Sequence, residues 1–213
     1  MTKKAHVLNS NEMRRLVKFV SETKNPERDT LMVLISFGLG LRAVEMAALK
    51  MSQFYNEDHS INETIQIKET KSYTTKAGKK KVNGRAVYLP SEQADRRIHD
   101  ALKSHIKHRI ESSQKKKVPF SLEQPLFLTQ HGTPFTNRSI QKKFESFYTG
   151  ADIKGASSHS GRRTFATTLI QNGADIKSVS TLMGHSSINM TGEYVQDNPD
   201  RLKKMVSNVL SFI

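Results

Sequence analysis

The sequence contains no cysteine among its 213 residues, and it lacks a long apolar run. Without cysteine there can be no disulfide, thiolate nucleophile or thiolate metal site, so nothing points to an oxidising compartment and a cytoplasmic location is expected. The longest apolar stretch, residues 31–41, is interrupted by Ser36, Gly38 and Gly40 and is shorter than the roughly 20 residues of a membrane-spanning helix. The amino end leads into polar sequence rather than a signal peptide core, so we expect neither a membrane span nor secretion.

Acidic residues are also few: the sequence has 20 Asp and Glu against 34 Lys and Arg, which gives a formal net charge of +14. A balance of this kind favours a polyanionic partner, either nucleic acid or an anionic membrane face. The composition, 36% hydrophobic and 25% charged, is that of an ordinary folded protein. A basic globular chain is therefore expected.

The basic residues gather in two tracts. Each tract could follow a phosphate backbone or could be an ordinary solvated surface, and the sequence leaves both interpretations open. The first tract is Lys68, Lys71, Lys76, Lys79, Lys80, Lys81 and Arg85, and the second is Lys103, Lys107, Arg109 and Lys115 to Lys117.

Apolar periodicity and cap residues predict a mainly helical chain. Asn9 and Glu12 have capping-box spacing ahead of a first helix, and Asn25-Pro26 opens a second, buried helix that stops at Gly38. A short third helix is expected over residues 42–50. Further helices are expected from residue 91 to the basic run at 115–117, after Thr136-Asn137, and over residues 162–172, 175–183, 187–195 and 198–213.

Two alternating segments, residues 64–67 and 86–89, predict an antiparallel hairpin with a long basic loop between them. Residues 125–128 read as a further short strand or extended segment. The predicted class is α+β, mainly helical with a small antiparallel three-stranded sheet. No linker or repeat divides the pattern, so residues 1–213 are expected to form one domain.

Four places in the sequence have residues that could take part in catalysis. They are Arg42 after a glycine-rich turn, His159 three residues before Arg162, His185 after Gly184, and Tyr194. Each alone has an ordinary explanation. An arginine at a helix boundary can pair with Glu45, the His159 segment can be surface basicity, a histidine can cap a helix, and a tyrosine can be half-buried in a core.

Together these residues match one reaction, the transfer of a phosphodiester to a protein hydroxyl. Arginine forks can hold two non-bridging phosphate oxygens as negative charge builds on them. The Tyr194 phenol, with a reference pKa near 10, needs a cationic environment or a base in order to attack, and His159 is the first choice for the base. A lysine of the basic hairpin could protonate the leaving oxygen. No carboxylate cluster is suggested that would hold catalytic metals. We therefore expect a metal-independent enzyme with no cofactor.

The same motifs resemble the tyrosine recombinase (phage integrase) family over nearly the whole chain. Residues 38–45 look like its first-arginine box, residues 159–167 like its His-x-x-Arg box, and residues 182–185 with the later tyrosine like its terminal box. The resemblance implies that Arg42 and Arg162 clamp the scissile phosphate while His159 handles a proton. It further implies that His185 hydrogen-bonds the phosphate, that Tyr194 forms a 3′-phosphotyrosyl link, and that Glu45 supports the first arginine.

The family's catalytic lysine lies in the hairpin, where two segments of this sequence resemble its context. Lys76, in Thr-Lys-x-Gly, matches better than Lys71. The sequence departs from the family at Gly161, where leucine is common, and in its long hairpin loop. Members generally carry a helical DNA-clamping domain before the catalytic one. Its absence here leaves a minimal recombinase or a fragment of a longer protein.

The resemblance implies a site-specific DNA recombinase or integrase of a phage or mobile element, which cleaves and rejoins double-stranded DNA. It also implies a homo-tetramer on DNA, joined by exchange of the C-terminal helix, residues 202–213. Two alternatives remain: a type IB topoisomerase, which uses nearly the same residues to relax supercoils, and a catalytically silent DNA-binding regulator. The intact reactive set argues against the regulator.

Overall fold

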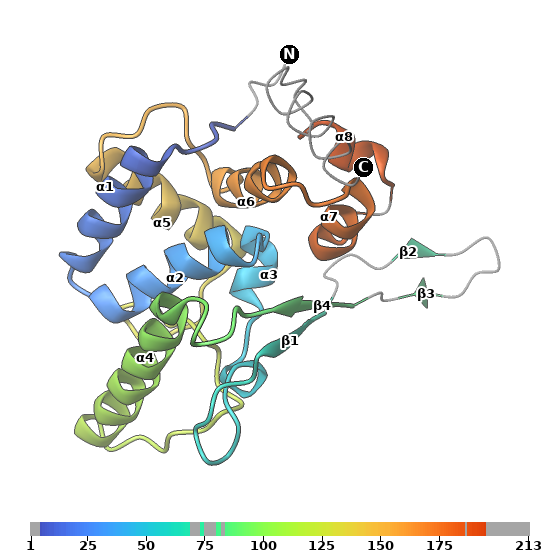
Figure 1. Ribbon diagram of the computed structural model, residues 1–213. Helices are drawn as coiled ribbons and strands as arrows, with labels where there is room; N and C mark the ends of the chain where they lie inside the picture. Colours follow the sequence, from blue (N-terminus) through green and yellow to red (C-terminus); the bar gives the residue numbers. More distant parts are fainter. Residues whose placement is uncertain (1–4, 69–72, 75–79, 82–83, 186, 195–213) are drawn as a thin grey trace. The chain divides into compact units, whose positions relative to one another are not determined.

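A computed structural model describes residues 5–68, 73–74, 80–81, 84–185 and 187–194 (Figure 1). The described residues fall into two compact units, with the boundary between Phe165 and Ala166. In this part of the chain no helix is both long and apolar enough to cross a membrane.

The first unit is mainly helical. Helix α2 contacts α1 and α4, and α5 contacts α1 and α3, so these helices enclose one apolar core. Helix α6 begins in this unit and crosses the boundary into the second. The elements are α1 (Ser10–Ser21), α2 (Pro26–Gly38), α3 (Ala43–Ala47), the 3₁₀ helix η1 (Met51–Gln53), α4 (Arg96–Lys115), α5 (Asn137–Gly150) and α6 (Ser160–Gln171).

Local signals at the first two helices are confirmed. The Asn9 side chain accepts hydrogen bonds from the backbone N–H groups of Asn11 and Glu12, and the Glu12 carboxylate accepts one from the N–H of Asn9. This is the capping box that the spacing predicts. Helix α2 starts at Pro26 and is apolar on nearly all sides because it lies in the core, where Leu31, Met32, Val33 and Ile35 are fully buried.

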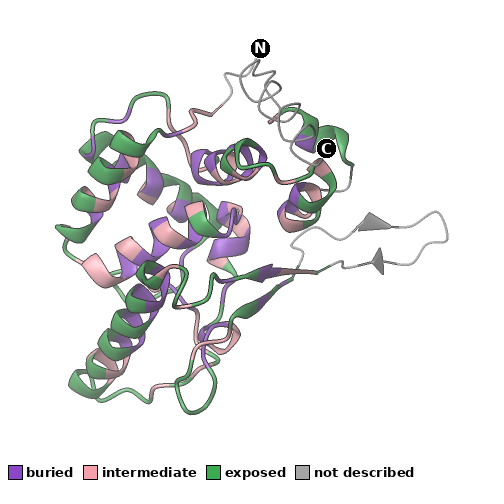
Figure 2. Cartoon of the chain, in the orientation of Figure 1, coloured by how far each residue is buried: buried purple, intermediate pink, exposed green. Residues whose placement is uncertain are grey.

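Helix α4 starts at Arg96, later than the expected start at residue 91. The backbone N–H of Asp95 bonds the carbonyl of Ser91, which closes a turn, and the Asp95 carboxylate then caps the helix by accepting from the N–H of Arg97. A buried stripe that includes Ile98 and Leu102 runs along α4, and its other face is exposed (Figure 2).

The predicted three-stranded sheet is wrong, because the described residues form two two-stranded antiparallel sheets. Strand β1 (Thr64–Ile67) pairs with β4 (Arg85–Tyr88), and β2 (Tyr73–Thr74) pairs with β3 (Lys80–Lys81). Residues 125–128 form only isolated bridges. The carbonyls of Pro125 and Leu126 accept hydrogen bonds from the Arg109 side chain, and His105 also bonds Leu126, so α4 side chains occupy groups that a strand would use.

The second unit holds the rest of α6, α7 (Ile176–Met183) and α8 (Asn189–Gly192), and α7 contacts α8. Asp175 caps α7 by accepting from the backbone N–H of Ser178. At its other end the backbone of Gly184 is left-handed, with φ of 60°. The helix expected over residues 187–195 is shorter in the structure, and the one expected over 198–213 lies outside the described residues.

Two buried tyrosines of the first unit give a matched stability test. The Tyr55 hydroxyl donates to the carbonyl of Leu102 at 2.9 Å, whereas the buried Tyr148 hydroxyl has no hydrogen-bond partner among the described residues. We expect Tyr55→Phe to lower the free energy of unfolding by about 1 kcal/mol, and Tyr148→Phe to leave it unchanged or raise it slightly. Urea denaturation checks this, and equal losses in both variants would contradict it.

Candidate active site

The first arginine is held at the start of α3 by a buried carboxylate. The backbone N–H of Arg42 donates to Glu45 Oε2 at 2.8 Å, and Arg42 Nη1 donates to Glu45 Oε1 at 2.8 Å. The Glu45 side chain is only 1% exposed, whereas that of Arg42 is 30% exposed. Arg42 is therefore anchored from inside the protein while part of its guanidinium stays accessible.

A second arginine, Arg85 of β4, binds the same carboxylate through both of its terminal nitrogens. Nη1 donates to Glu45 Oε1 at 2.6 Å and Nη2 donates to Oε2 at 3.0 Å. In the sequence Arg85 falls among basic residues that could follow a phosphate backbone, but its side chain is only 12% exposed. This ion pair could not be predicted from the sequence, because its partners lie 40 residues apart and no local pattern connects them.

Arg162, in the first turn of α6, reaches the same neighbourhood. It is 4% exposed, and its Nη1 donates to the carbonyl of Gly40 at 2.8 Å. Gly40 has φ of 60°, and a Cβ at this position would lie 2.5 Å from the Phe165 ring. A glycine is therefore required at residue 40 if α6 is to approach the turn between α2 and α3 closely enough for this hydrogen bond.

Three arginines lie near the Glu45 carboxylate and set its pKa. Burial alone would raise the pKa of this carboxyl, but hydrogen bonding and charge from Arg85, a backbone hydrogen bond from Arg42 and the charge of Arg162 outweigh burial and hold the pKa below its usual range. The carboxylate is thus ionised at neutral pH. Three guanidinium charges against one carboxylate leave a local surplus of positive charge, which suits an anionic phosphodiester.

His159 lies in the turn that opens α6, and it is exposed. Its backbone carbonyl accepts the first hydrogen bond of the helix, from the N–H of Arg163 at 2.9 Å. Between His159 and Arg162, a Cβ at Gly161 would lie 2.2 Å from Ser36 Oγ. The glycine that stands where the family commonly has leucine therefore lets α6 pack directly against α2.

The second unit contains the other two candidates. The rings of His185 and Tyr194 are stacked, with centroids 6.0 Å apart and an interplanar angle of 15°. His185 Nδ1 lies 2.8 Å from the hydroxyl oxygen of Thr191, which is fully buried. No sequence motif points to Thr191, although it falls one helical turn before Tyr194 and so could share a face with it.

The structure thus groups the candidates into two sets. Arg42, His159 and Arg162 belong to the first unit, and His185 and Tyr194 belong to the second. The hairpin lysines Lys71 and Lys76 both lie outside the described residues.

The structure leaves fewer residues of the second basic tract exposed than the sequence suggests. Arg109 is buried and its guanidinium donates to the backbone carbonyls of Pro125 and Leu126, so it cannot follow a phosphate backbone. Lys103 pairs with Glu92 at 2.7 Å. Lys103, Lys107 and Lys115 to Lys117 all remain exposed, so Arg109 is the one residue of this tract that the structure buries.

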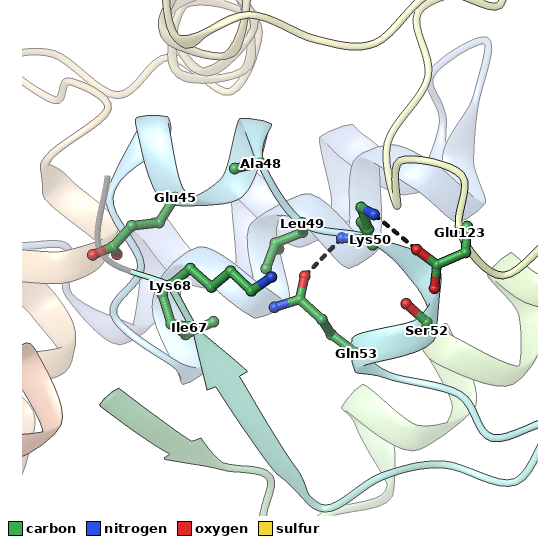
Figure 3. Close-up of a pocket in the computed structure, with 9 residues that line it drawn as sticks. All are labelled: Glu45, Ala48, Leu49, Lys50, Ser52, Gln53, Ile67, Lys68 and Glu123. Carbon is green, nitrogen blue, oxygen red and sulfur yellow. Dashed lines mark hydrogen bonds and ion pairs between the residues drawn. The ribbon is translucent and has the colours of Figure 1, made fainter. Parts of the chain in front are cut away.

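A pocket of about 260 Å³ lies beside Glu45 in the first unit (Figure 3). Lys68, at the end of β1, runs along it, and an ion pair between Lys50 and Glu123 at 2.7 Å flanks it. Its acidic groups are already paired with basic side chains. In the described ranges no three or more His, Asp or Glu side chains gather in a way that could hold a metal ion.

Replacing Arg85 tests whether it belongs to the buried ion pair rather than to the surface. We expect Arg85→Met to lower the free energy of unfolding by about 3 kcal/mol, because it leaves the buried Glu45 carboxylate short of its bidentate partner. Lys68→Met, directly after the neighbouring strand β1, removes an exposed charge and should change stability by less than about 0.5 kcal/mol. Urea denaturation measures both, and equal effects would show that Arg85 is an ordinary surface cation.

The sequence matches the model of the phage integrase family over residues 6–201. The chain therefore belongs to the phage integrase family. It is similar to tyrosine recombinase XerD of Staphylococcus saprophyticus, with 27% identity over 201 residues, which cover 93% of this chain and 60% of XerD. The chain thus spans about three fifths of the length of this curated relative.

Solved structures show that the fold is shared. The Tn1549 transposon integrase in complex with transposon right end DNA has a TM-score of 0.72 at 20% identity, covering 98% of this chain and 67% of the integrase. The catalytic domain of bacteriophage HP1 integrase has a TM-score of 0.59 at 23% identity, covering 96% of this chain and 95% of that domain. The mainly helical fold with its small antiparallel sheets is that of these catalytic domains.

Proposed function

We propose that this chain is the catalytic domain, residues 1–213, of a site-specific DNA recombinase that cleaves and rejoins DNA through a covalent 3′-phosphotyrosine intermediate on Tyr194. Membership of the phage integrase family supports this proposal. So do the names of the proteins it resembles, a tyrosine recombinase and a transposon integrase in complex with DNA.

One observation supports the proposal most strongly: arginines that lie far apart in the sequence, Arg42 and Arg162, come together near the buried carboxylate of Glu45. It binds Arg42 directly, and Arg162 lies close enough for its charge to lower the pKa of the same carboxyl. A structural ion pair needs only one arginine, whereas a clamp on the two non-bridging oxygens of a phosphodiester needs surplus guanidinium groups. Arg42 and Arg162 are therefore proposed to hold the scissile phosphate.

The proposed reaction is an exchange of one phosphodiester for another. The Tyr194 oxygen attacks phosphorus and forms the Tyr–O–P bond, the bond from phosphorus to the 5′ oxygen breaks, and the phenol proton passes to His159. The leaving 5′ oxygen takes a proton from a hairpin lysine, Lys76 in preference to Lys71. Attack by the 5′ hydroxyl of a partner strand reverses the step and rejoins the DNA.

Electrostatic stabilisation in this mechanism comes from the protein itself. The guanidinium groups supply the positive charge that opposes the growing negative charge on phosphorus oxygens, and His185 donates a hydrogen bond to one of them. We infer that the reaction needs no metal ion. Double-stranded DNA is the proposed partner, with a homo-tetramer assembled on it through residues 202–213.

Covalent trapping tests the proposed function. Labelled duplexes that tile the DNA flanking the gene, each nicked so that the short 5′ fragment is lost after cleavage, are incubated with the chain in the presence of EDTA. We expect a covalent protein–DNA adduct on the duplex that carries the target site, and recombinant products when two such sites are supplied. Adduct formation with relaxation but no recombinants would contradict the recombinase assignment, and an adduct that EDTA abolishes would contradict the metal-free mechanism.

A further inference from the structure

His185 is fixed at both its backbone and its ring. Helix α7 ends in a turn where the N–H of Gly184 bonds the carbonyl of Thr181 and the N–H of His185 bonds the carbonyl of Ser180. These are the two hydrogen bonds of the Schellman motif, with the left-handed Gly184 at its centre. The backbone of His185 is therefore set by the end of α7, and its ring is set by Thr191 and by the stacked Tyr194.

The hydrogen-bond inventory of Thr191 determines which ring nitrogen of His185 carries a proton. A threonine hydroxyl has one proton to donate, and Thr191 is fully buried, so leaving that proton without an acceptor would be costly. Among the described residues, Nδ1 of His185 is the one group that lies within hydrogen-bonding distance of the hydroxyl, at 2.8 Å. Donation from the hydroxyl to Nδ1 requires Nδ1 to be unprotonated, so the neutral ring carries its proton on Nε2.

When the His185 ring is protonated, Nε2 is still a hydrogen-bond donor. In the imidazolium form Nδ1 carries a proton and donates to the Thr191 oxygen, which can accept it by turning its own proton aside. Nε2 still carries a proton. The hydroxyl can thus serve both charge states of His185, and in both of them the nitrogen on the other side of the ring from Thr191 is a hydrogen-bond donor.

We propose that Thr191 is a positioning residue that keeps His185 as an Nε2–H donor whatever its charge, so that the ring can always donate to a non-bridging phosphate oxygen. This inference rests on the proposed function for its catalytic consequence, but the tautomer itself can be observed without any reaction. The stacked ring of Tyr194 limits rotation of the imidazole, so the direction of the donor is fixed together with its identity.

The test combines a spectrum with a rate. Two-bond ¹H–¹⁵N correlation spectra of the histidine-labelled chain are recorded at about pH 8.5, where histidine is mostly neutral, and His185 is assigned by the signal lost in His185→Gln. We expect the wild type to show protonated Nε2 and unprotonated Nδ1. We expect Thr191→Val to show a mixture of tautomers and to form the DNA adduct roughly tenfold more slowly, the effect of one hydrogen bond. DNA affinity should be unchanged.

Matched variants separate this role from folding. Thr191→Ser keeps the hydroxyl and should restore both the tautomer and the rate. Thr181→Val removes an exposed hydroxyl that bonds the carbonyl of Lys177 in α7, and it should behave as wild type. A wild-type His185 protonated on Nδ1 would overturn the proposal, as would a Thr191→Val variant with unchanged tautomer and rate. A wild type that forms no adduct but shows the expected tautomer would instead count against the proposed function.

Discussion

Replacing Tyr194 by Phe is expected to abolish the covalent protein–DNA adduct while DNA affinity stays unchanged. The substitution removes one oxygen atom, the proposed nucleophile, and keeps the ring that stacks on His185. A nucleophile that forms the covalent intermediate cannot be replaced by positioning or charge, so the loss should exceed a thousandfold, the order seen when a catalytic nucleophile is removed elsewhere. Trapping on nicked DNA measures the adduct, and a gel-shift titration measures binding.

The matched control is Tyr88→Phe. Tyr88 lies on β4 and is 59% exposed, so removal of its hydroxyl should affect neither folding nor adduct formation. An adduct that persists in Tyr194→Phe, or one that disappears equally in Tyr88→Phe, would refute Tyr194 as the nucleophile.

Replacing Glu45 by Gln is expected to weaken both the fold and the reaction. The amide keeps the shape of the side chain but removes the charge that pairs with Arg42 and Arg85. Breaking a buried ion pair typically costs about 3 to 5 kcal/mol, which urea denaturation will show. Because Arg42 then loses its anchor, adduct formation by the folded variant should fall roughly 100-fold, as expected for a misplaced catalytic group.

The contribution of Glu45 to stability should also depend on pH, which acid denaturation can measure. The pKa of Glu45 is lower in the folded chain than its ordinary value of 4.5, so the folded state binds fewer protons at this site than the unfolded state does. The stability that this ionised carboxylate contributes is therefore fully present above about pH 4.5 and is lost as the pH falls through the folded pKa. Glu45→Gln should show a shallower loss of stability in this acid range.

Glu123→Gln is the control for a charge in an exposed pair. Glu123 pairs with Lys50 beside the same pocket, but its side chain is 70% exposed. Exposed ion pairs contribute little, so this variant should retain both stability and adduct formation. Equal effects of Glu45→Gln and Glu123→Gln would remove the special role given to the buried carboxylate.

Features encoded by neighbouring residues could be predicted from the sequence. The cap of α1 involves Asn9 and Glu12 only three residues apart, and the pairing of Arg42 with Glu45 lies within one helical turn. The glycine that ends α7 is equally local, because a residue without a Cβ adopts the left-handed backbone of this position at no steric cost. In each case the physical partners are also neighbours in the chain.

Features that depend on distant partners could not be predicted in this way. Arg85 and Arg109 look like surface cations in the sequence, yet one bonds a carboxylate 40 residues away and the other bonds carbonyls of residues 125 and 126. The same carbonyls explain why residues 125–128 do not extend the sheet, although their apolar pattern suits a strand. Composition and periodicity describe what a residue can do but not which partner satisfies it.

The candidate site is intermediate between these cases. Its residue types and order were sufficient to suggest phosphodiester transfer, because few reactions need arginines, histidines and a tyrosine together. The sequence does not indicate the residues that hold these side chains in place. Arg85 hydrogen-bonds Glu45, and Thr191 hydrogen-bonds His185. An arginine in a hairpin or a threonine in a helix is too common to suggest such a role.

The most direct test is to identify the amino acid that becomes linked to DNA. The trapped adduct is digested with nuclease and protease, and the peptide that retains a nucleotide is sequenced by mass spectrometry. We expect a single modified residue, Tyr194, joined through its phenolic oxygen to a 3′ phosphate. Linkage to any other residue, or to a 5′ phosphate, would contradict it.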